Sequence, residues 1–184
     1  MSNYLVSGAA GFIASRTIQL LLEAGHDVTA IDNVNDYYDI RLKTYRLRKT
    51  AEFAGAGPGI TAKLDYVNGL PGSYSGPSDF TSGKLRFIQM DIEDRECLNH
   101  LFARNRFDAV FNLAARAGVR RSLEIPEAYL KTNVIGTLNL LECMRIYDVP
   151  KLVLASTSSL YAGQPLPFVE TLPVNNPLSP YSAS

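Results

Sequence analysis

Apolar runs of strand length alternate with amphipathic segments of helix length along almost the whole chain. The apolar runs cover residues 4–7, 28–31, 85–90, 109–113 and 152–155, and the amphipathic segments cover 12–24, 38–49, 93–103 and 126–147. Each strand in such a pattern returns to the same end of the sheet through a crossover. Crossovers are right-handed, and their helices cover both faces of the sheet. The alternation therefore predicts an α/β fold with a doubly wound parallel sheet.

One segment interrupts this pattern. Residues 52–83 contain seven glycines, three prolines and several serines, which is too many turn formers for a packed element. We predict a long surface insertion there, between the second helix and the third strand. The length of 184 residues and the hydrophobic content of 46% suit a single domain over 1–184.

Composition excludes several classes of function. The 18 basic and 18 acidic side chains cancel, so the totals give no sign of a nucleic-acid-binding surface. Cys97 and Cys143 lie far apart without the spacing of metal ligands. The first apolar run is too short for a signal peptide or a membrane span. We expect a cytoplasmic protein that binds no metal, nucleic acid or membrane.

A glycine-rich stretch, residues 8–14, lies where the first strand gives way to the first helix. Gly8 allows a tight turn, and Gly11 allows the backbone to approach a pyrophosphate. The helix N-terminus adds unpaired N–H donors and a positive dipole end. Ala14 occupies the third position of the motif, which is usually glycine. The stretch predicts a Rossmann-type dinucleotide site, and an ordinary strand-to-helix turn is the alternative.

Acidic residues follow the second and third strands. Asp32 stands where a carboxylate accepts hydrogen bonds from an adenosine ribose, which favours NAD over NADP because a 2′-phosphate would meet a like charge. A helix cap is the alternative for this residue. Asp91 and Ile92 stand where an adenine could be held, although Asp91 would also suit the N-cap of the next helix. The small Ala114 and Ala115 would let a flat ring pass close to the backbone, or they are simply core residues.

Five stretches of the chain are similar to one enzyme superfamily: residues 8–14, 31–43, 112–120, 133–137 and 155–161. On these residues the chain resembles the extended short-chain dehydrogenase/reductases, and among them the nucleotide-sugar 4-epimerases that act on UDP-glucuronate. The stretch at 32–39 followed by Ala-Gly-Val-Arg at 117–120 points to the glucuronate branch. The chain departs from the family at four positions, with Asn112 for histidine, Arg116 for glutamine, and Ala14 and Ala162 for glycine.

The resemblance implies NAD as cofactor, a UDP-sugar as substrate, and roles for individual residues. Thr157 falls where the family contacts the sugar 4-hydroxyl, and Tyr181 falls on its catalytic tyrosine. Arg120, with Ser158 and Ser159, falls on the substrate side. Phe12 and Ile13 are counted with the cofactor contacts, and core packing is the simpler alternative for both. The predicted cofactor contacts are Gly8, Gly11, Phe12, Ile13, Asp32, Asn33, Asp91, Ile92, Leu113, Ala114, Ala115, Asn133 and Tyr181.

The implied reaction inverts a carbon that has no acidic proton, so C4 must be oxidised transiently by bound NAD to a 4-keto sugar. A free tyrosine has a pKa of about 10 and needs nearby positive charge to act as the base. The family supplies a Tyr-x-x-x-Lys lysine, which here would be residue 185. We therefore expect a chain truncated before the C-terminal substrate-binding part, with little activity, and a homodimer in the complete form.

Two other hypotheses stay open. Another UDP-sugar epimerase, a dehydratase or a decarboxylase would begin with the same oxidation, although dehydratases of this kind usually carry an acidic pair where Ser158 and Ser159 stand. A non-catalytic dinucleotide-binding module would leave Thr157 as a strand-end turn, Arg120 as a helix-end charge and Tyr181 as a surface side chain. Measuring NAD binding beside conversion of UDP-glucuronate separates the non-catalytic module from the epimerase.

Overall fold

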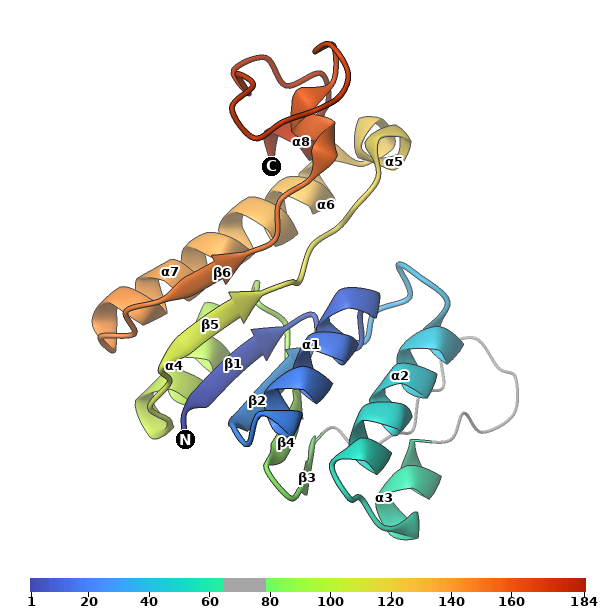
Figure 1. The fold of residues 1–184 in the computed structure, drawn as a ribbon, viewed down its shortest axis with the longest axis vertical. Coiled ribbons are helices and arrows are strands. Elements are labelled where there is room, and N and C mark those ends of the chain that lie inside the picture. Colours follow the sequence, from blue (N-terminus) through green and yellow to red (C-terminus); the bar gives the residue numbers. More distant parts are fainter. Residues whose placement is uncertain (65–78) are drawn as a thin grey trace.

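The computed structural model describes residues 1–64 and 79–184, and it confirms the doubly wound α/β fold (Figure 1). Its sheet has the strand order β3-β4-β2-β1-β5-β6, in which β3 is antiparallel to β4 and all other neighbours are parallel. The strands are β1 (Asn3–Ser7), β2 (Asp27–Asp32), β3 (Asp79–Ser82), β4 (Leu85–Gln89), β5 (Ala109–Asn112) and β6 (Leu152–Leu154). The order reverses between β1 and β5, and such a switch point is where ligands bind in open α/β sheets.

Helices cover both faces of the sheet (Figure 1). One face carries α1 (Phe12–Glu23), α2 (Ile40–Phe53) and α3 (Pro58–Lys63), and the other carries α4 (Arg95–Arg104) and α7 (Thr137–Ile146). Beyond the carboxyl ends of the strands lie the short helices α5 (Val119–Glu124), α6 (Pro126–Tyr129) and α8 (Pro180–Ala183). Within the described residues, no helix has the length and apolar character needed to cross a membrane.

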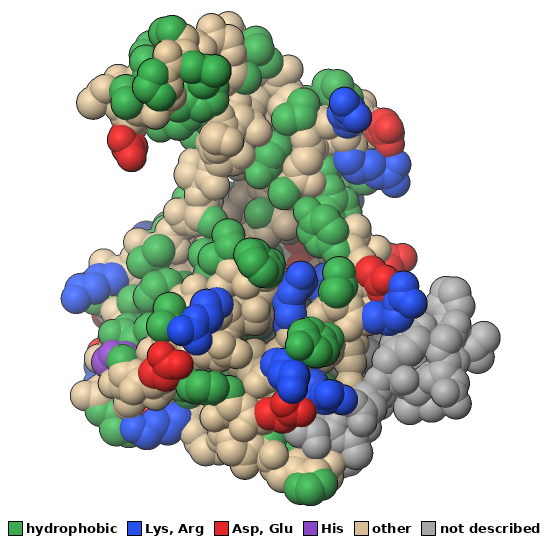
Figure 2. Space-filling view, turned by 45° about the vertical axis from the view of Figure 1, so that its right-hand side comes forward, with side chains coloured by type: hydrophobic (Ala, Val, Ile, Leu, Met, Phe, Trp, Pro, Cys, Tyr) green, Lys and Arg blue, Asp and Glu red, His purple; other side chains and the backbone are tan. Residues whose placement is uncertain are grey.

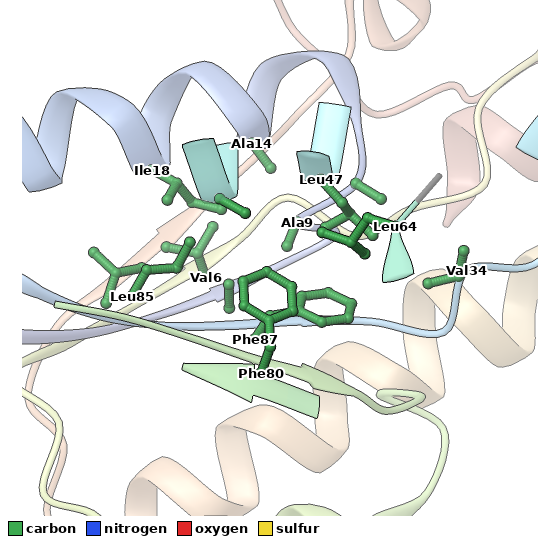
Figure 3. Close-up of a cluster of buried hydrophobic side chains, with 14 residues drawn as sticks. Val6, Ala9, Ala14, Ile18, Val34, Leu47, Leu64, Phe80, Leu85 and Phe87 are labelled. Carbon is green, nitrogen blue, oxygen red and sulfur yellow. The ribbon is translucent and has the colours of Figure 1, made fainter. Parts of the chain in front are cut away.

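The sheet separates two hydrophobic cores because successive strand side chains point to opposite faces. In β1, Val6 packs in the core under α1 and α2, while its neighbour Leu5 packs in the core under α4 and α7. Ile18 of α1 reaches the first core together with Phe80 and Phe87, whose rings stack with centroids 5.3 Å apart (Figure 3). Burial of each such side chain contributes roughly 1.5–3 kcal/mol.

The predicted insertion at 52–83 is partly wrong. Within that range the structure places the end of α2, the helix α3 and the edge strand β3, and the remaining residues, 65–78, lie outside the described part of the chain. Phe80 and Ser82 alternate with exposed residues and turn toward the core, as a half-buried strand requires. Gly83, with φ 53°, makes the tight turn that returns the chain into β4. The strand was missed because the surrounding glycines and serines obscure its period.

The predicted helix over 126–147 is not uniform. A π-helical segment, Leu130–Gly136, lies between α6 and α7. Thr132 and Asn133 are buried within it. Wide turns of this kind occur frequently at functional sites, and a 3.6-residue period does not reveal them. The segment passes close to the end of β4, since a Cβ on Gly136 would lie 2.6 Å from the Ile92 side chain.

Asn139 of α7 fixes the loop that follows β4. Its side-chain amide donates hydrogen bonds to the backbone oxygens of Ile92 and Glu93, both at 3.1 Å. We predict that Asn139→Ala lowers the free energy of unfolding by about 1–3 kcal/mol, because both oxygens lose their partner in a buried setting. Urea denaturation measures the effect. Arg145→Ala on the same helix breaks only an exposed ion pair and serves as control; equal midpoints for the two variants would contradict the prediction.

Candidate functional site

Two adjoining cavities open at the switch point of the sheet. The Asp32 cavity, of about 100 Å³, lies at the carboxyl ends of β1, β2, β4 and β5. The Thr157 cavity, of about 620 Å³, lies between the first turn of α1 and the residues that follow β6. Figure 2 shows the molecule hollowed between the body of the sheet and its C-terminal segment. Both cavities are lined by Gly11, Tyr38 and residues 113–115, so one elongated ligand could occupy both.

The turn between β1 and α1 is built for close approach of a ligand. Gly8 has φ 71°, and a Cβ on it would lie 2.7 Å from the backbone nitrogen of Ala114. The Gly11 N–H donates to the Gly8 carbonyl at 2.8 Å. Among the residues that the structure describes, no side chain caps α1, so the N–H groups of its first turn remain available beside the cavity that Gly11 lines. This arrangement fits the pyrophosphate of a dinucleotide. Ala14 is buried, and its methyl is accommodated in the core.

Phe12 and Ile13 are not core residues, so that alternative is wrong. Phe12 is 79% exposed and Ile13 is 63% exposed, and both line the Thr157 cavity. The buried stripe of α1 consists of Ala14 and Ile18, and the helical period places the two preceding residues outside it. Their position in a cavity wall agrees with the predicted contact to a bound ligand.

Asp32 braces the glycine turn from the end of β2. Its carboxylate accepts hydrogen bonds from the N–H groups of Ala10 at 3.0 Å and Val34 at 2.7 Å, and the residue is only 7% exposed. The helix-cap alternative is wrong, because Asp39 caps α2. The carboxylate still lines the Asp32 cavity, where it can accept further hydrogen bonds.

Lys43 of α2 is a cavity residue that sequence reasoning missed. Its ammonium lies 3.7 Å from the Asp32 carboxylate and donates a hydrogen bond to Asn35 Oδ1 at 2.8 Å. Burial lowers the pKa of Lys43, and the nearby Asp32 opposes that shift. The signal in the sequence was a lysine on the side of α2 that also carries Leu47, where a charged residue needs a partner.

Asn33 and Asp91 join the loops after β2 and β4. The Asn33 amide donates to the Asp91 carboxylate at 2.7 Å, and the other carboxylate oxygen accepts from Glu93 N–H at 2.9 Å. Asp94 caps α4, so the N-cap alternative for Asp91 is wrong. Ile92 is 4% exposed and packs in the core beneath this loop. These three predicted residues line the same cavity.

Asn133 holds the loop that separates the two cavities. From the π-helical segment, its side chain accepts a hydrogen bond from Arg116 N–H at 2.8 Å and donates one to the Arg116 carbonyl at 3.0 Å. Leu113, Ala114 and Ala115 immediately precede that clamp and line both cavities. The small side chains of Ala114 and Ala115 therefore lie in the walls of both cavities, and their contact with a flat ring stays a prediction.

Thr157 and Tyr181, which are separated in sequence, line the same cavity. The Thr157 oxygen accepts a hydrogen bond from Ser159 N–H at 3.2 Å. Thr157 therefore also forms the strand-end turn that the hypothesis of a non-catalytic module predicted. The hydroxyl keeps its proton for a second partner. Tyr181 lies in the first turn of α8, which a capping box between Ser179 and Ser182 closes.

The predicted substrate contacts Arg120, Ser158 and Ser159 are not among the residues that line either cavity. Arg120 is exposed on α5. Ser158, the residue next to Thr157 in the chain, is also exposed. Their role in substrate binding stays a prediction.

Two tyrosines, Tyr37 and Tyr129, support the loop after β5, and sequence reasoning missed both. The Tyr37 hydroxyl donates to the Ala117 carbonyl at 2.6 Å and is hydrogen-bonded to the Tyr129 hydroxyl. Tyr129 is fully buried, and its ring lies with its centroid 6.0 Å from that of Tyr181. Burial, followed by the Tyr129 hydrogen bond, raises the pKa of Tyr37 to about 12.

Comparison with known proteins agrees with this geometry. The model of the NAD dependent epimerase/dehydratase family matches residues 4–184. A UDP-glucuronate 4-epimerase of Thermodesulfobacterium geofontis is 44% identical over 184 residues, which are 100% of this chain and 48% of that protein. UDP-glucose 4-epimerase of Mus musculus is 33% identical over 100% of the chain and 46% of its own length. The solved Thermus thermophilus UDP-glucose 4-epimerase in complex with NAD is 31% identical and superposes with a TM-score of 0.67 over 98% of this chain and 46% of that one.

The sheet order, the glycine turn and the acidic residue at the end of β2 define a Rossmann-type dinucleotide-binding protein. The chain belongs to the NAD dependent epimerase/dehydratase family, whose cofactor is NAD. It spans about half the length of the curated relatives it matches.

Gly8→Ala tests the cofactor turn. We predict NAD binding about tenfold weaker or worse, because the added methyl meets the Ala114 backbone and the positive φ disfavours any side chain. Gly57→Ala is the matched control, since a Cβ there meets no atom of the described residues within 4 Å. Isothermal titration with NAD measures both variants. Unchanged affinity of Gly8→Ala would show that this turn does not hold the dinucleotide.

The raised pKa of Tyr37 predicts how the stability of the protein depends on pH. The Tyr37 pKa in the folded protein is about 12, above the ordinary tyrosine value of 10.0, so the folded state holds the phenolic proton more tightly. The stability that this provides is present below pH 10 and is lost as the pH rises toward 12. Absorbance titration near 295 nm should show one component removed by Tyr37→Phe with a midpoint near the higher value. If the component that Tyr37→Phe removes has its midpoint at the ordinary tyrosine pKa, the raised pKa of Tyr37 is contradicted.

Proposed function

We propose that the protein acts as an NAD-dependent nucleotide-sugar 4-epimerase that interconverts UDP-glucuronate and UDP-galacturonate through a transient 4-keto sugar. The observation that carries the proposal is the meeting of Thr157 and Tyr181 in one cavity, directly beside the cavity of the glycine turn and Asp32. The 44% identity to a UDP-glucuronate 4-epimerase supports this sugar. The chain spans about half of that relative, so the activity is proposed for the protein at its relatives' length.

The residues of the Asp32 cavity suit the cofactor. The first turn of α1 with Gly8 and Gly11 would hold the pyrophosphate, and Asp32 with Lys43 would hold the adenosine ribose. Bound NAD supplies reversible hydride acceptance at the sugar C4. Asn133, placed by its clamp on the loop after β5, would lie on the nicotinamide side.

The residues of the Thr157 cavity suit proton transfer at the sugar. The Tyr181 oxygen would take the proton of the C4 hydroxyl, and the Thr157 hydroxyl would orient that group. The exposed rings and branches of Phe12 and Ile13 would exclude water from the reacting face. Tyr181 needs a neighbouring cation to act as base at neutral pH. In the family that the sequence resembles, the lysine of the Tyr-x-x-x-Lys pattern supplies that cation.

UDP-glucose is the alternative sugar, because UDP-glucose 4-epimerases also match nearly all of the chain. A dehydratase is less well supported, since Ser158 and Ser159 offer no carboxyl group for elimination. The homodimer, the cytoplasmic location and the substrate role of Arg120 stay predictions.

Substitutions at the Thr157 cavity test the reaction in the protein extended to the length of its relatives. We predict that Tyr181→Phe lowers kcat by about 10²–10⁴-fold, since it removes the group that transfers the proton. Thr157→Val should lower kcat about tenfold through loss of one orienting hydrogen bond. Thr157→Val should bind NAD normally. Conversion of UDP-glucuronate and of UDP-glucose is followed separately by anion-exchange chromatography.

Thr171→Val, at an exposed position, is the control for the loss of a threonine hydroxyl. Full activity of Tyr181→Phe would remove the tyrosine from the mechanism. If the extended protein binds NAD and converts neither sugar, the non-catalytic dinucleotide-binding module becomes the better description. Preference for UDP-glucose would retain the epimerase and replace the proposed sugar.

A further inference from the structure

Arg116 lines the Asp32 cavity at a position where the family resembled by the sequence commonly has glutamine. Its guanidinium is held in place by two contacts. The Nε atom donates to Thr132 Oγ1 at 3.0 Å, and the guanidinium carbon lies 5.1 Å from the centroid of the Tyr37 ring. The Asn133 clamp fixes the backbone of the same residue.

Thr132 and Tyr37, which contact the guanidinium, are each fixed by a further hydrogen bond. Thr132 donates its hydroxyl proton to Glu93 Oε1 at 2.6 Å, which leaves its oxygen free to accept from Arg116. Tyr37 is anchored through its hydroxyl to the Ala117 carbonyl. An arginine side chain ordinarily loses much of its rotamer freedom when it is ordered on binding. The Arg116 side chain is already ordered before a ligand binds, so binding loses little further rotamer freedom.

The charge of Arg116 has no ion-pair partner in the described part of the chain. The carboxylates of the cavity are engaged elsewhere: Asp32 is paired with Lys43, and Asp91 accepts from Asn33. Glu93 reaches Arg116 only through the Thr132 hydroxyl. Over residues 1–64 and 79–184, the structure shows no hydrogen bond from the two terminal nitrogens of the guanidinium. An oriented cation with unused donors in a cavity wall is suited to an anionic ligand group.

We infer that Arg116 binds the diphosphate of the dinucleotide, on the side of the Asp32 cavity formed by the loop after β5. Gly8 and Gly11 line the same cavity from the β1 side, so the two walls would hold the diphosphate between them. A planar guanidinium carries a positive charge and can donate hydrogen bonds to two phosphate oxygens at once. Glutamine is neutral and lacks this geometry. Arg116 does not line the Thr157 cavity, which argues against a contact with the sugar carboxylate. The inference rests on the dinucleotide site of the proposed function and adds a residue to it.

Arg116→Gln tests the inference by isothermal titration with adenosine, ADP, ADP-ribose and NAD. We expect ADP, ADP-ribose and NAD to bind about tenfold more weakly, with adenosine binding unchanged. The salt dependence of binding of the three diphosphates should also decrease, because one cationic contact is lost. Arg121→Gln, which removes an exposed arginine paired with Glu124 on α5, is the matched control and should leave all four affinities unchanged.

Arg116→Lys is the second variant, because it keeps the charge and loses the planar fork. It should bind the diphosphates more tightly than Arg116→Gln and less tightly than the unaltered protein. Equal weakening of adenosine and NAD in both variants would show a purely structural role and overturn the inference, as would unchanged affinities in Arg116→Gln. If the unaltered protein binds none of the four ligands, the proposed function fails as well. Binding by the unaltered protein with no diphosphate-specific loss overturns the Arg116 assignment alone.

Discussion

The close approach of Gly8 to the backbone of residues 113–114 is the constraint on which the site depends. A single methyl on Gly8 would lie 2.7 Å from the Ala114 nitrogen, so the turn after β1 and the loop after β5 can occupy their places only with glycine there. The strand order reverses between these same two strands. The crevice that forms at a topological switch point therefore has backbone on both walls, which is the surface that a diphosphate requires.

A chain of polar side chains keeps the two strands in register at that point. Ser7 of β1 donates to Asn112 Oδ1 at 2.6 Å, and the Asn112 amide donates to Thr137 Oγ1 of α7 at 2.9 Å. The Ser7 oxygen in turn accepts from Ala114 N–H at 3.3 Å. Asn112 stands where histidine is common in the family that the sequence resembles. In this protein its amide satisfies a donor and an acceptor in a buried position, so the substitution leaves the site intact.

The cofactor side and the sugar side of the site are built differently. Asp32 and Asp91 sit at the ends of central strands and are locked by backbone and side-chain hydrogen bonds. Thr157 follows β6, which is an edge strand whose Val153 and Leu154 are 47% and 52% exposed. Functional groups on strands and helices are positioned more precisely than groups on the loops that follow them. The dinucleotide site is therefore the better-determined half of the arrangement.

By itself the sequence determined the doubly wound sheet, the glycine turn and the acidic residue after β2, because periodicity and local turn chemistry act over a few residues. Only the tertiary structure decided that Phe12 and Ile13 face a cavity, that β3 adds an antiparallel edge, and that a π-helical segment presents Asn133. It also brought Tyr37 against Arg116 and Tyr129, both of which lie far from it in the chain. These features depend on which surfaces meet after folding. A linear pattern carries the propensity of each segment and not the identity of its neighbour in space.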